Sequence, residues 1–403
     1  MTTAQLVRWS RSAPDAAAVR FLLSAQVTTA ASGGPVPRLL RSTVDRHLTP
    51  VLHRAIAGEH LGAADIDALT APDPLTEPFT VDPGTGAVPG PVDERIEALR
   101  RAYGPFADWW RQYFAGHGDD PVPLTDLWRL YLPFACWIAA VKRRSRPGEL
   151  FVVGFNGSPG SGKTVLSNAL AVLLDVLLDP VTEGRAVARS GDDWYLSRAE
   201  REPMRALGYD PGIPGVTNRS GPGTHDLAWL RRNLAEMADS GSAGGVIRMG
   251  NFDKRADDQP TGADRYFEVR GRVGVFLFDL WFAGAETDVD PALLPDGLRR
   301  RVAEQLRQWR PVFDRMDALW SFAWPSFAQM VSDREAQEVL VARRRGTRGM
   351  SAEQIRAFMT YMIERTWDWR TTSPVPPDHA VTFRAERDTN HRIIAVQRGG
   401  RAW

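Results

Sequence analysis

One short segment of the chain combines glycines, a lysine and a threonine at a spacing with a recognisable chemistry. It fits the pattern Gly, four residues, Gly-Lys-Thr, and consists of Gly157, Ser158, Pro159, Gly160, Ser161, Gly162, Lys163 and Thr164. Glycines let backbone N–H groups converge on phosphate oxygens, and a helix that begins here adds the positive end of its dipole. Lys163 would bridge the β and γ phosphates of a nucleotide, and the Thr164 hydroxyl would bind Mg²⁺. The alternative is a turn that matches by chance.

The residues on either side decide between these interpretations. Leu150 to Phe155 is a short apolar run rich in Val and Phe, which predicts a buried strand, and Val165 to Leu178 has the pattern of a helix. Only three of the 50 basic residues are lysines, and Lys163 is one of them. The sequence therefore predicts a phosphate-binding loop (P-loop) that binds ATP with Mg²⁺, although no motif separates ATP from GTP.

Acidic residues follow two of the predicted strands. Asp192 and Asp193 come after Ala186 to Ala188, which would end the second strand of the sheet, and Asp279 follows the buried run Val273 to Phe278. Phosphoryl transfer to an alcohol requires a carboxylate that orients the hydroxyl and accepts its proton. Asp192 is the candidate catalytic base, acting with Lys163, and Asp279 is a candidate for holding Mg²⁺ through water. The alternative for the paired Asp192 and Asp193 is turn chemistry or helix capping, and the alternative for Asp279 is another turn carboxylate.

Other polar residues lie where an acceptor molecule would bind. Thr224, as N-cap, is predicted to open a helix after a glycine-rich corner that suits an anion or a hydroxyl group. Lys254 lies in a charged loop between two short strands, where it would neutralise an acidic substrate. Capping and a solvated loop explain these residues equally well. The candidate substrate-binding residues are Asp193, Tyr195, His225, Asp226, Lys254 and Arg265.

Four arginines precede a helix that begins with a capping box formed by Ser351 and Gln354. This helix is expected from Ala352 to about Trp369, and the arginines would supply positive charge from a lid. They are Arg343, Arg344, Arg345 and Arg348.

Composition narrows the class of protein. With 50 basic and 49 acidic residues, the chain of 403 residues has no net field that favours nucleic acid or a membrane. The apolar stretch Leu130 to Val141 is shorter than the roughly 20 residues of a membrane span and predicts a buried helix. The N-terminus shows no secretory signal. The expected partner is a small hydroxylated molecule and the expected compartment is the cytoplasm, while the oligomeric state stays open.

The order of elements predicts an α/β fold, with a parallel sheet flanked by helices. Residues 1–90 are expected to form a helical N-terminal region and a linker rich in Pro and Gly, in which residues 71–91 have no regular element. Residues 91–403 are expected to form the P-loop domain, with leading helices and a lid. A final strand is expected near His391 to Val396.

Taken in order, these motifs resemble the P-loop D-glycerate 3-kinases of the plant and fungal type, which are relatives of uridine kinase, phosphoribulokinase and bacterial pantothenate kinase. The shared segments are Tyr131-Leu132-Pro133-Phe134, Asp192-Asp193-Trp194-Tyr195-Leu196, Gly223-Thr224-His225-Asp226-Leu227, Phe252-Asp253-Lys254, Asp264-Arg265, Phe278-Asp279-Leu280-Trp281 and Gly349-Met350-Ser351. The resemblance covers roughly residues 92–396. It implies an ATP-dependent small-molecule kinase with a P-loop kinase core, a mobile lid and Asp192 as its base.

Two departures from the family pattern concern the acceptor. The chain has Asp279-Leu280 where the family usually has Glu-Gly, and Gly250-Asn251 where it usually has Pro-Arg. Loss of that arginine would weaken recognition of a carboxylate. Glycerate or a related hydroxy acid is the first candidate acceptor, with contacts from Lys254, Arg265 and His225. A sugar, a nucleoside or a biosynthetic intermediate is the alternative, and a nucleotide-binding protein without kinase activity is a third hypothesis.

Overall fold

The computed structural model describes most of the chain from residue 39 onward. The described ranges are 39–82, 86–87, 91–114, 122–213, 218–219, 221–243, 245–254, 256–294, 296–324, 326–345, 350–366, 374–389 and 391–399. None of the helices in these ranges combines the length and the hydropathy that a membrane span requires.

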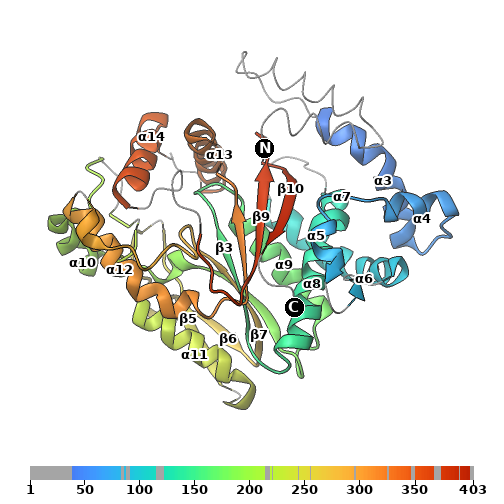
Figure 1. The fold of residues 1–403 in the computed structure, drawn as a ribbon, viewed down its shortest axis with the longest axis horizontal. Helices are drawn as coiled ribbons and strands as arrows, with labels where there is room; N and C mark the ends of the chain where they lie inside the picture. The colour runs from blue at the N-terminus through green and yellow to red at the C-terminus, as the bar shows by residue number, and fades with distance from the viewer. Residues whose placement is uncertain are drawn as a thin grey trace.

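A six-stranded sheet forms the centre of the described structure (Figure 1). Its strands are β3 (Phe151–Asn156), β4 (Arg185–Ser190), β7 (Val273–Asp279), β8 (Ala318–Phe322), β9 (Val381–Arg387) and β10 (Ile393–Gly399). The spatial order is β10-β9-β8-β3-β7-β4; all neighbours pair in parallel except β10, which is antiparallel to β9. The predicted α/β fold with a parallel sheet is confirmed. Within this sheet, β3 leads into the glycine loop.

The described helices lie on both faces of this sheet and at the periphery of the structure (Figure 1). They are α3 (Leu39–Ala57), α4 (Ala63–Thr70), α5 (Glu77–Thr80), α6 (Val92–Tyr113), α7 (Leu124–Asp126), α8 (Leu132–Ser145), α9 (Lys163–Leu177), α10 (Arg198–Arg201), α11 (Leu227–Ala243), α12 (Gly297–Phe313), α13 (Phe327–Arg345) and α14 (Ala352–Tyr361). A π-helical turn, Leu127–Tyr131, joins α7 to α8, and another, Met362–Thr366, continues α14. Two antiparallel pairs lie outside the central sheet: β1 (Val81–Asp82) with β2 (Gly86–Ala87), and β5 (Val246–Gly250) with β6 (Tyr266–Arg270).

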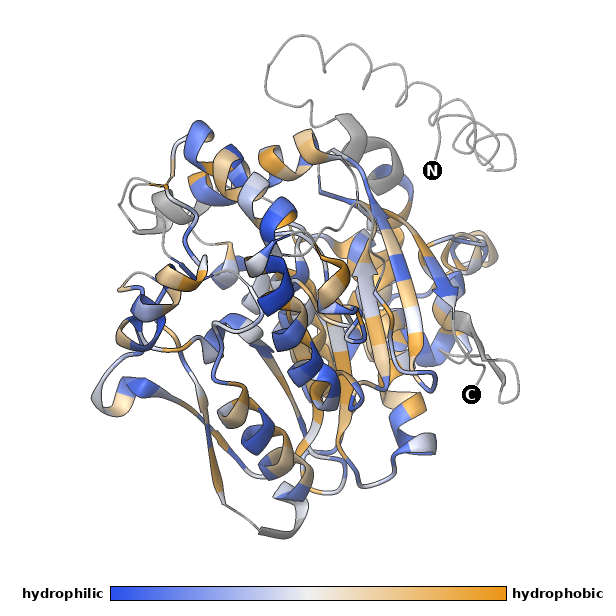
Figure 2. Ribbon diagram, turned by 60° about the vertical axis from the view of Figure 1, so that its left-hand side comes forward, coloured by the Kyte–Doolittle hydropathy of each residue, from blue (hydrophilic) through white to orange (hydrophobic). Residues whose placement is uncertain are grey.

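Alternation along the strands divides the core into two layers. Val153 faces the cluster that includes α5, α6, α8 and α9, whereas its neighbour Val152 faces the cluster with α11, α12 and α14. The central strands are accordingly largely orange in Figure 2. Because β3 and β7 are buried on both faces, their sequences are continuous apolar runs, as is typical of parallel strands.

The described part of the N-terminal region shares the first of these cores. Phe79 on α5 is fully buried and stacks on Phe134 of α8, with ring centroids 4.9 Å apart. It also lies 5.1 Å from the ring of Phe383 on β9. The expectation that residues 71–91 have no regular element is wrong, because α5 and the β1–β2 pair form there. The apolar Phe79 is the physical reason, since burying it anchors one helical turn between prolines.

Two further expectations about helix ends need correction. Asp226, not Thr224, caps α11, because its Oδ1 accepts a hydrogen bond from the Trp229 N–H at 2.8 Å. The Thr224 hydroxyl is fully buried and donates to the Gly221 carbonyl at 2.7 Å. The capping box of Ser351 and Gln354 is confirmed. The helix that it opens is α-helical only to Tyr361, and residues 367–369 lie outside the described part.

Candidate functional site

The glycine loop connects β3 to α9, as the sequence predicts. Gly160 and Gly162 have φ angles of +82° and +97°, which side chains rarely adopt. A Cβ on Gly160 would also lie 2.8 Å from the backbone of Asp333. Glycine is therefore required at residue 160 by both its conformation and its surroundings, and the loop keeps its N–H groups at the start of α9.

Lys163 is folded back onto its own loop. Its Nζ donates to the carbonyls of Gly157 at 2.7 Å and Ser158 at 3.0 Å, and the side chain is buried. Burial lowers the pKa of Lys163, while the carboxylates of Asp279 and Asp192 act in the opposite direction. An ammonium in this position is a ready partner for phosphate oxygens. The buried Ser161 hydroxyl, which has no hydrogen-bond partner in the described structure, is a second donor in the same loop.

Thr164 and Asp279 meet at the carboxyl edge of the sheet. The Thr164 hydroxyl donates to Asp279 Oδ2, and the carboxyl group is only 3% exposed. Burial raises the pKa of Asp279, and the nearby Lys163 ammonium opposes that shift. Strand pairing sets this edge, since Asp279 is in register with Phe155 of β3 and Ser190 of β4. Hydroxyl and carboxylate oxygens are the protein ligands that suit Mg²⁺, so these two residues fit the ion that accompanies a nucleotide.

Asp192 forms an ion pair with Lys254, whose Nζ lies 2.7 Å from Asp192 Oδ2. Burial would raise the pKa of Asp192, but the Lys254 ammonium outweighs it and holds that pKa well below the usual range. Burial would likewise lower the pKa of Lys254, and the Asp192 carboxylate raises it instead. Both side chains keep partial exposure, 27% for Asp192 and 41% for Lys254. The carboxylate is thus ionised and accessible next to the phosphate loop.

Asp193, in contrast to Asp192, is held by contacts within the protein. Its Oδ2 accepts a hydrogen bond from the Ser190 N–H at 3.0 Å and pairs with Arg189 Nε at 3.1 Å. Burial raises the pKa of Asp193 to about 6, against the effect of the Arg189 guanidinium. Gly250 explains the tight fit, because a Cβ there would lie 2.3 Å from the Asp193 carbonyl oxygen. Asp193 joins the end of β4 to the β5–β6 hairpin.

Three aromatic rings pack against one another beside Asp192. Tyr195 stacks on His225 with centroids 4.3 Å apart, and Phe252 meets Tyr195 edge-on at 5.4 Å. Burial lowers the pKa of His225 to about 4, and the Asp192 carboxylate opposes this shift. Burial and the same carboxylate raise the pKa of Tyr195 well above its usual value. The imidazole is therefore neutral, and neither ring nitrogen has a hydrogen-bond partner of good geometry.

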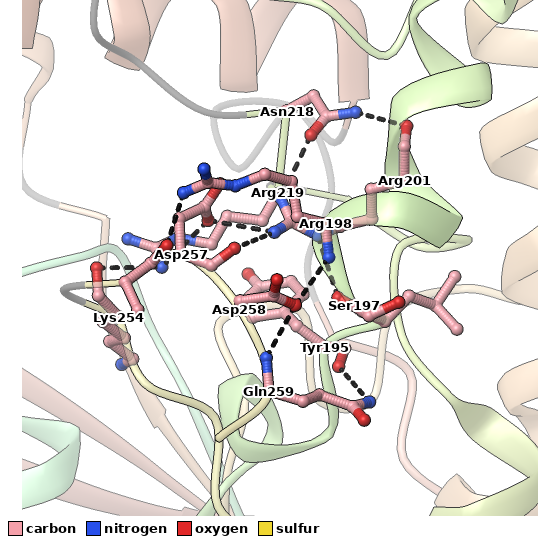
Figure 3. Close-up of polar contacts among 12 residues, drawn as sticks. Tyr195, Ser197, Arg198, Arg201, Asn218, Arg219, Lys254, Asp257, Asp258 and Gln259 are labelled. Atoms are coloured by element: carbon pink, nitrogen blue, oxygen red, sulfur yellow. Dashed lines mark hydrogen bonds and ion pairs between the residues drawn. The ribbon is translucent and has the colours of Figure 1, made fainter. Parts of the chain in front are cut away.

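A buried arginine network fixes the loop that carries Lys254 (Figure 3). Arg201 is fully buried; its Nη2 pairs with Asp257 Oδ1 at 3.1 Å, and its Nη1 donates to Asn218 Oδ1 at 3.0 Å. Arg219 lies 3.3 Å from the same Asp257 oxygen and donates to the Lys254 carbonyl at 3.3 Å. Asp257 lies between these arginines in the figure, which ties the loop to α10.

Arg219 is a site residue that sequence reasoning did not find. Its guanidinium lies 5.4 Å from the Phe252 ring centre, and its charge acts on the pKa values of Asp192 and Tyr195. The chain has too many arginines for its residue type to be a signal. A second such residue is Arg334 on α13, whose pKa burial lowers and whose charge interacts with Glu338, Arg219 and Asp192.

The remaining candidates lie apart from this cluster. Asp226 is occupied as the cap of α11. Arg265 is exposed, and its guanidinium lies 5.6 Å from the ring centre of Tyr266. The side chains of the four candidate lid arginines lie outside the described part of the structure.

Leu280, one of the departures from the family pattern, is 1% exposed. It packs under Gly191, where a Cβ would lie 2.4 Å from Leu280 Cδ1. Leu280 thus acts on the site through the backbone before Asp192, and does not line it. Asn251, the other departure, donates to the Asp264 carbonyl at 2.8 Å and so belongs to the β5–β6 connection.

Comparison with known proteins identifies kinases. The uncharacterized kinase mug58 of Schizosaccharomyces pombe is 25% identical to the chain over 242 residues, which are 55% of this chain and 82% of that protein. No protein-family model matches. Among solved structures, D-glycerate 3-kinase from Cryptococcus neoformans is 22% identical with a TM-score of 0.49, over 66% of this chain and 96% of that one. The YGR205w protein is 18% identical with a TM-score of 0.49, over 66% and 97%.

These relatives include the group of kinases that the sequence motifs resemble. With TM-scores below 0.5, the fold assignment depends on the strand order and the glycine loop described above. The sequence relative is itself described as an uncharacterized kinase.

Proposed function

We propose that this chain is a kinase that uses ATP with Mg²⁺ to phosphorylate an alcohol group of a small anionic metabolite, with D-glycerate or a related hydroxy acid as the first candidate. The observation that carries the proposal is the ionised Asp192 carboxylate, paired with Lys254 at 2.7 Å and within electrostatic range of the phosphate-loop lysine.

The phosphate side of the reaction uses the glycine loop. Lys163 and the loop N–H groups bind the phosphates. Thr164 and Asp279 would hold Mg²⁺, which would supply positive charge against the phosphates. Lys163 already lies among acceptors, so exchanging two loop carbonyls for phosphate oxygens requires no charged group to be newly buried.

The acceptor side uses Asp192. The carboxylate accepts a hydrogen bond from the acceptor hydroxyl and orients its oxygen toward the γ phosphorus. A new O–P bond forms, the bond between the γ phosphorus and the bridging oxygen breaks, and the hydroxyl proton passes to Asp192. Because its pKa is low, Asp192 is a weak base, which suits a reaction in which the proton leaves late.

The charges around Asp192 favour an anionic acceptor. Lys254 approaches the cluster from the loop after β5, and Arg219 approaches it from the segment before α11. A neutral His225 and the Tyr195 hydroxyl offer hydrogen bonds. Arg219, and not the exposed Arg265, is thus the second cation for the acceptor. Charge-assisted hydrogen bonds to a carboxylate contribute about 1.5–3 kcal/mol each.

The experiment is ADP release by the purified protein with Mg·ATP, with and without D-glycerate, using Lys163→Ala as the blank. We expect glycerate-dependent release that disappears in the variant. A panel of hydroxy acids, sugars and nucleosides follows in the same assay. Turnover with a neutral sugar or nucleoside in preference to every hydroxy acid would contradict the anionic acceptor, and release that persists in Lys163→Ala would contradict the phosphate-loop assignment.

A further inference from the structure

A second cation lies beside the phosphate loop, on an element that the proposed reaction does not use. Arg387 ends β9, and its Nη2 pairs with Asp333 Oδ2 of α13 at 2.8 Å. The two side chains are 4% and 0% exposed. Asp333 is also held by Gln329, whose Nε2 donates to Asp333 Oδ1 at 2.6 Å.

Both partners of this ion pair contact residues that touch the glycine loop. The Asp333 backbone lies 2.8 Å from the position of a Cβ on Gly160. The Arg387 guanidinium lies 5.3 Å from the ring centre of Phe322, and that ring is 3.0 Å from the position of a Cβ on Gly157. The ion pair therefore lies next to the glycine loop, and the Arg387 charge acts on the pKa of Lys163.

Arg387 has hydrogen-bonding capacity that the described structure does not use. Its Nε is buried and has no partner, and its Nη1 meets only the half-exposed His391, at 3.3 Å from Nδ1. A guanidinium has five N–H donors, and leaving one buried without a partner costs free energy. The Ser161 hydroxyl of the loop has the same deficit. One buried donor without a partner thus lies on the loop and another lies beside it, which indicates an anion that satisfies both.

A purely structural role explains these observations less well. A buried ion pair contributes little net stability compared with apolar residues of similar size. It does fix the direction of a guanidinium, and Asp333 leaves most donors of Arg387 free for another acceptor.

We propose that Arg387 binds the phosphate groups of the nucleotide and that Asp333 positions it for that contact. This inference rests on the proposed function, because it takes the glycine loop to bind a nucleoside triphosphate. It assigns β9 a direct part in phosphate binding and α13 a positioning part.

The test is equilibrium titration of Mg·ATP against the full-length wild type and Arg387→Gln, over a range of salt concentrations. We expect the variant to bind ATP roughly 10- to 100-fold more weakly, the equivalent of one or two charge-assisted hydrogen bonds. Its affinity should also depend less on salt, since one cation is gone. Arg384→Gln, at an exposed position of the same strand, is the matched control and should bind as the wild type does.

A second variant guards against misfolding. The double variant Arg387→Met/Asp333→Asn removes both charges of the buried pair, so no uncompensated charge is left and the protein should fold. Its affinity for ATP should still be lower than that of the wild type. If either folded variant binds ATP with wild-type affinity and salt dependence, the inference is overturned while the proposed function stands. If the wild type itself does not bind Mg·ATP, the proposed function fails first.

Discussion

Replacing Asp192 by asparagine tests the acceptor side of the proposed reaction. Asn keeps the shape of the side chain but removes the charge that pairs with Lys254 at 2.7 Å. Because the two side chains are 27% and 41% exposed, loss of the pair should change the free energy of unfolding by only about 1 kcal/mol or less. Loss of a positioned base lowers kcat by 10²–10⁴-fold in general. The low pKa of Asp192 makes it a weak base, so we expect a fall on the order of 10², or about 2.7 kcal/mol in the barrier.

The assay is steady-state ADP release at saturating ATP, together with ATP affinity measured directly. Asp192→Asn should keep its ATP affinity while kcat falls. Asp193→Asn is the matched control, since Asp193 caps a turn and pairs with Arg189; it should lose stability with a smaller effect on kcat. An unchanged kcat in Asp192→Asn, or a larger fall in Asp193→Asn, would refute the reasoning and move the base to Asp193.

Three further predictions concern the surroundings of Asp192. Lys254→Met should raise the acceptor KM roughly 10- to 100-fold and leave the ATP KM unchanged, whereas Arg265→Gln, at an exposed position, should alter neither KM. If both variants raised the acceptor KM equally, Lys254 would not be the cation that binds the acceptor. The pKa of His225 is about 4 in the folded protein and 6.5 in the unfolded chain. The neutral imidazole therefore contributes fully to the free energy of unfolding above about pH 6.5, and this contribution is lost as the pH falls toward 4. Urea unfolding at a series of pH values measures this. The free energy of unfolding of the wild type, relative to that of His225→Phe, should fall by about 3 kcal/mol between pH 6.5 and pH 4. A difference between the two proteins that stays constant with pH would contradict the neutral, buried imidazole. Gly191→Ala should cost about 1–3 kcal/mol through its clash with Leu280, and adding Leu280→Ala should cost less than the sum of the two single changes; simple additivity would disprove the contact.

The strands and the phosphate loop were predictable because their signals are local. Leu150 to Phe155 is apolar along its whole length because β3 is buried on both faces, and the Gly-Lys-Thr end follows at once. The scarcity of lysine also singled out Lys254, which the structure places on Asp192 from 62 residues away in the sequence.

Other parts of the site depend on contacts between distant residues, which spacing does not encode. Thr224 and Asp226 are both ordinary capping residues. The structure decides between them, because Asp226 accepts from the Trp229 N–H while the buried Thr224 hydroxyl donates to Gly221. Arg219 is one of many arginines, and its role follows from the network around Asp257. Arg387 and Asp333 are separated by 54 residues and meet because β9 and α13 converge on the loop.

The most direct test of the kinase assignment is the fate of the γ-phosphoryl group. The purified protein is incubated with γ-labelled ATP, Mg²⁺ and D-glycerate, and the labelled products are separated. Label in a phosphorylated acceptor, absent with Lys163→Ala, is the predicted result. Label recovered only as inorganic phosphate, with every hydroxylated acceptor supplied, would contradict the account.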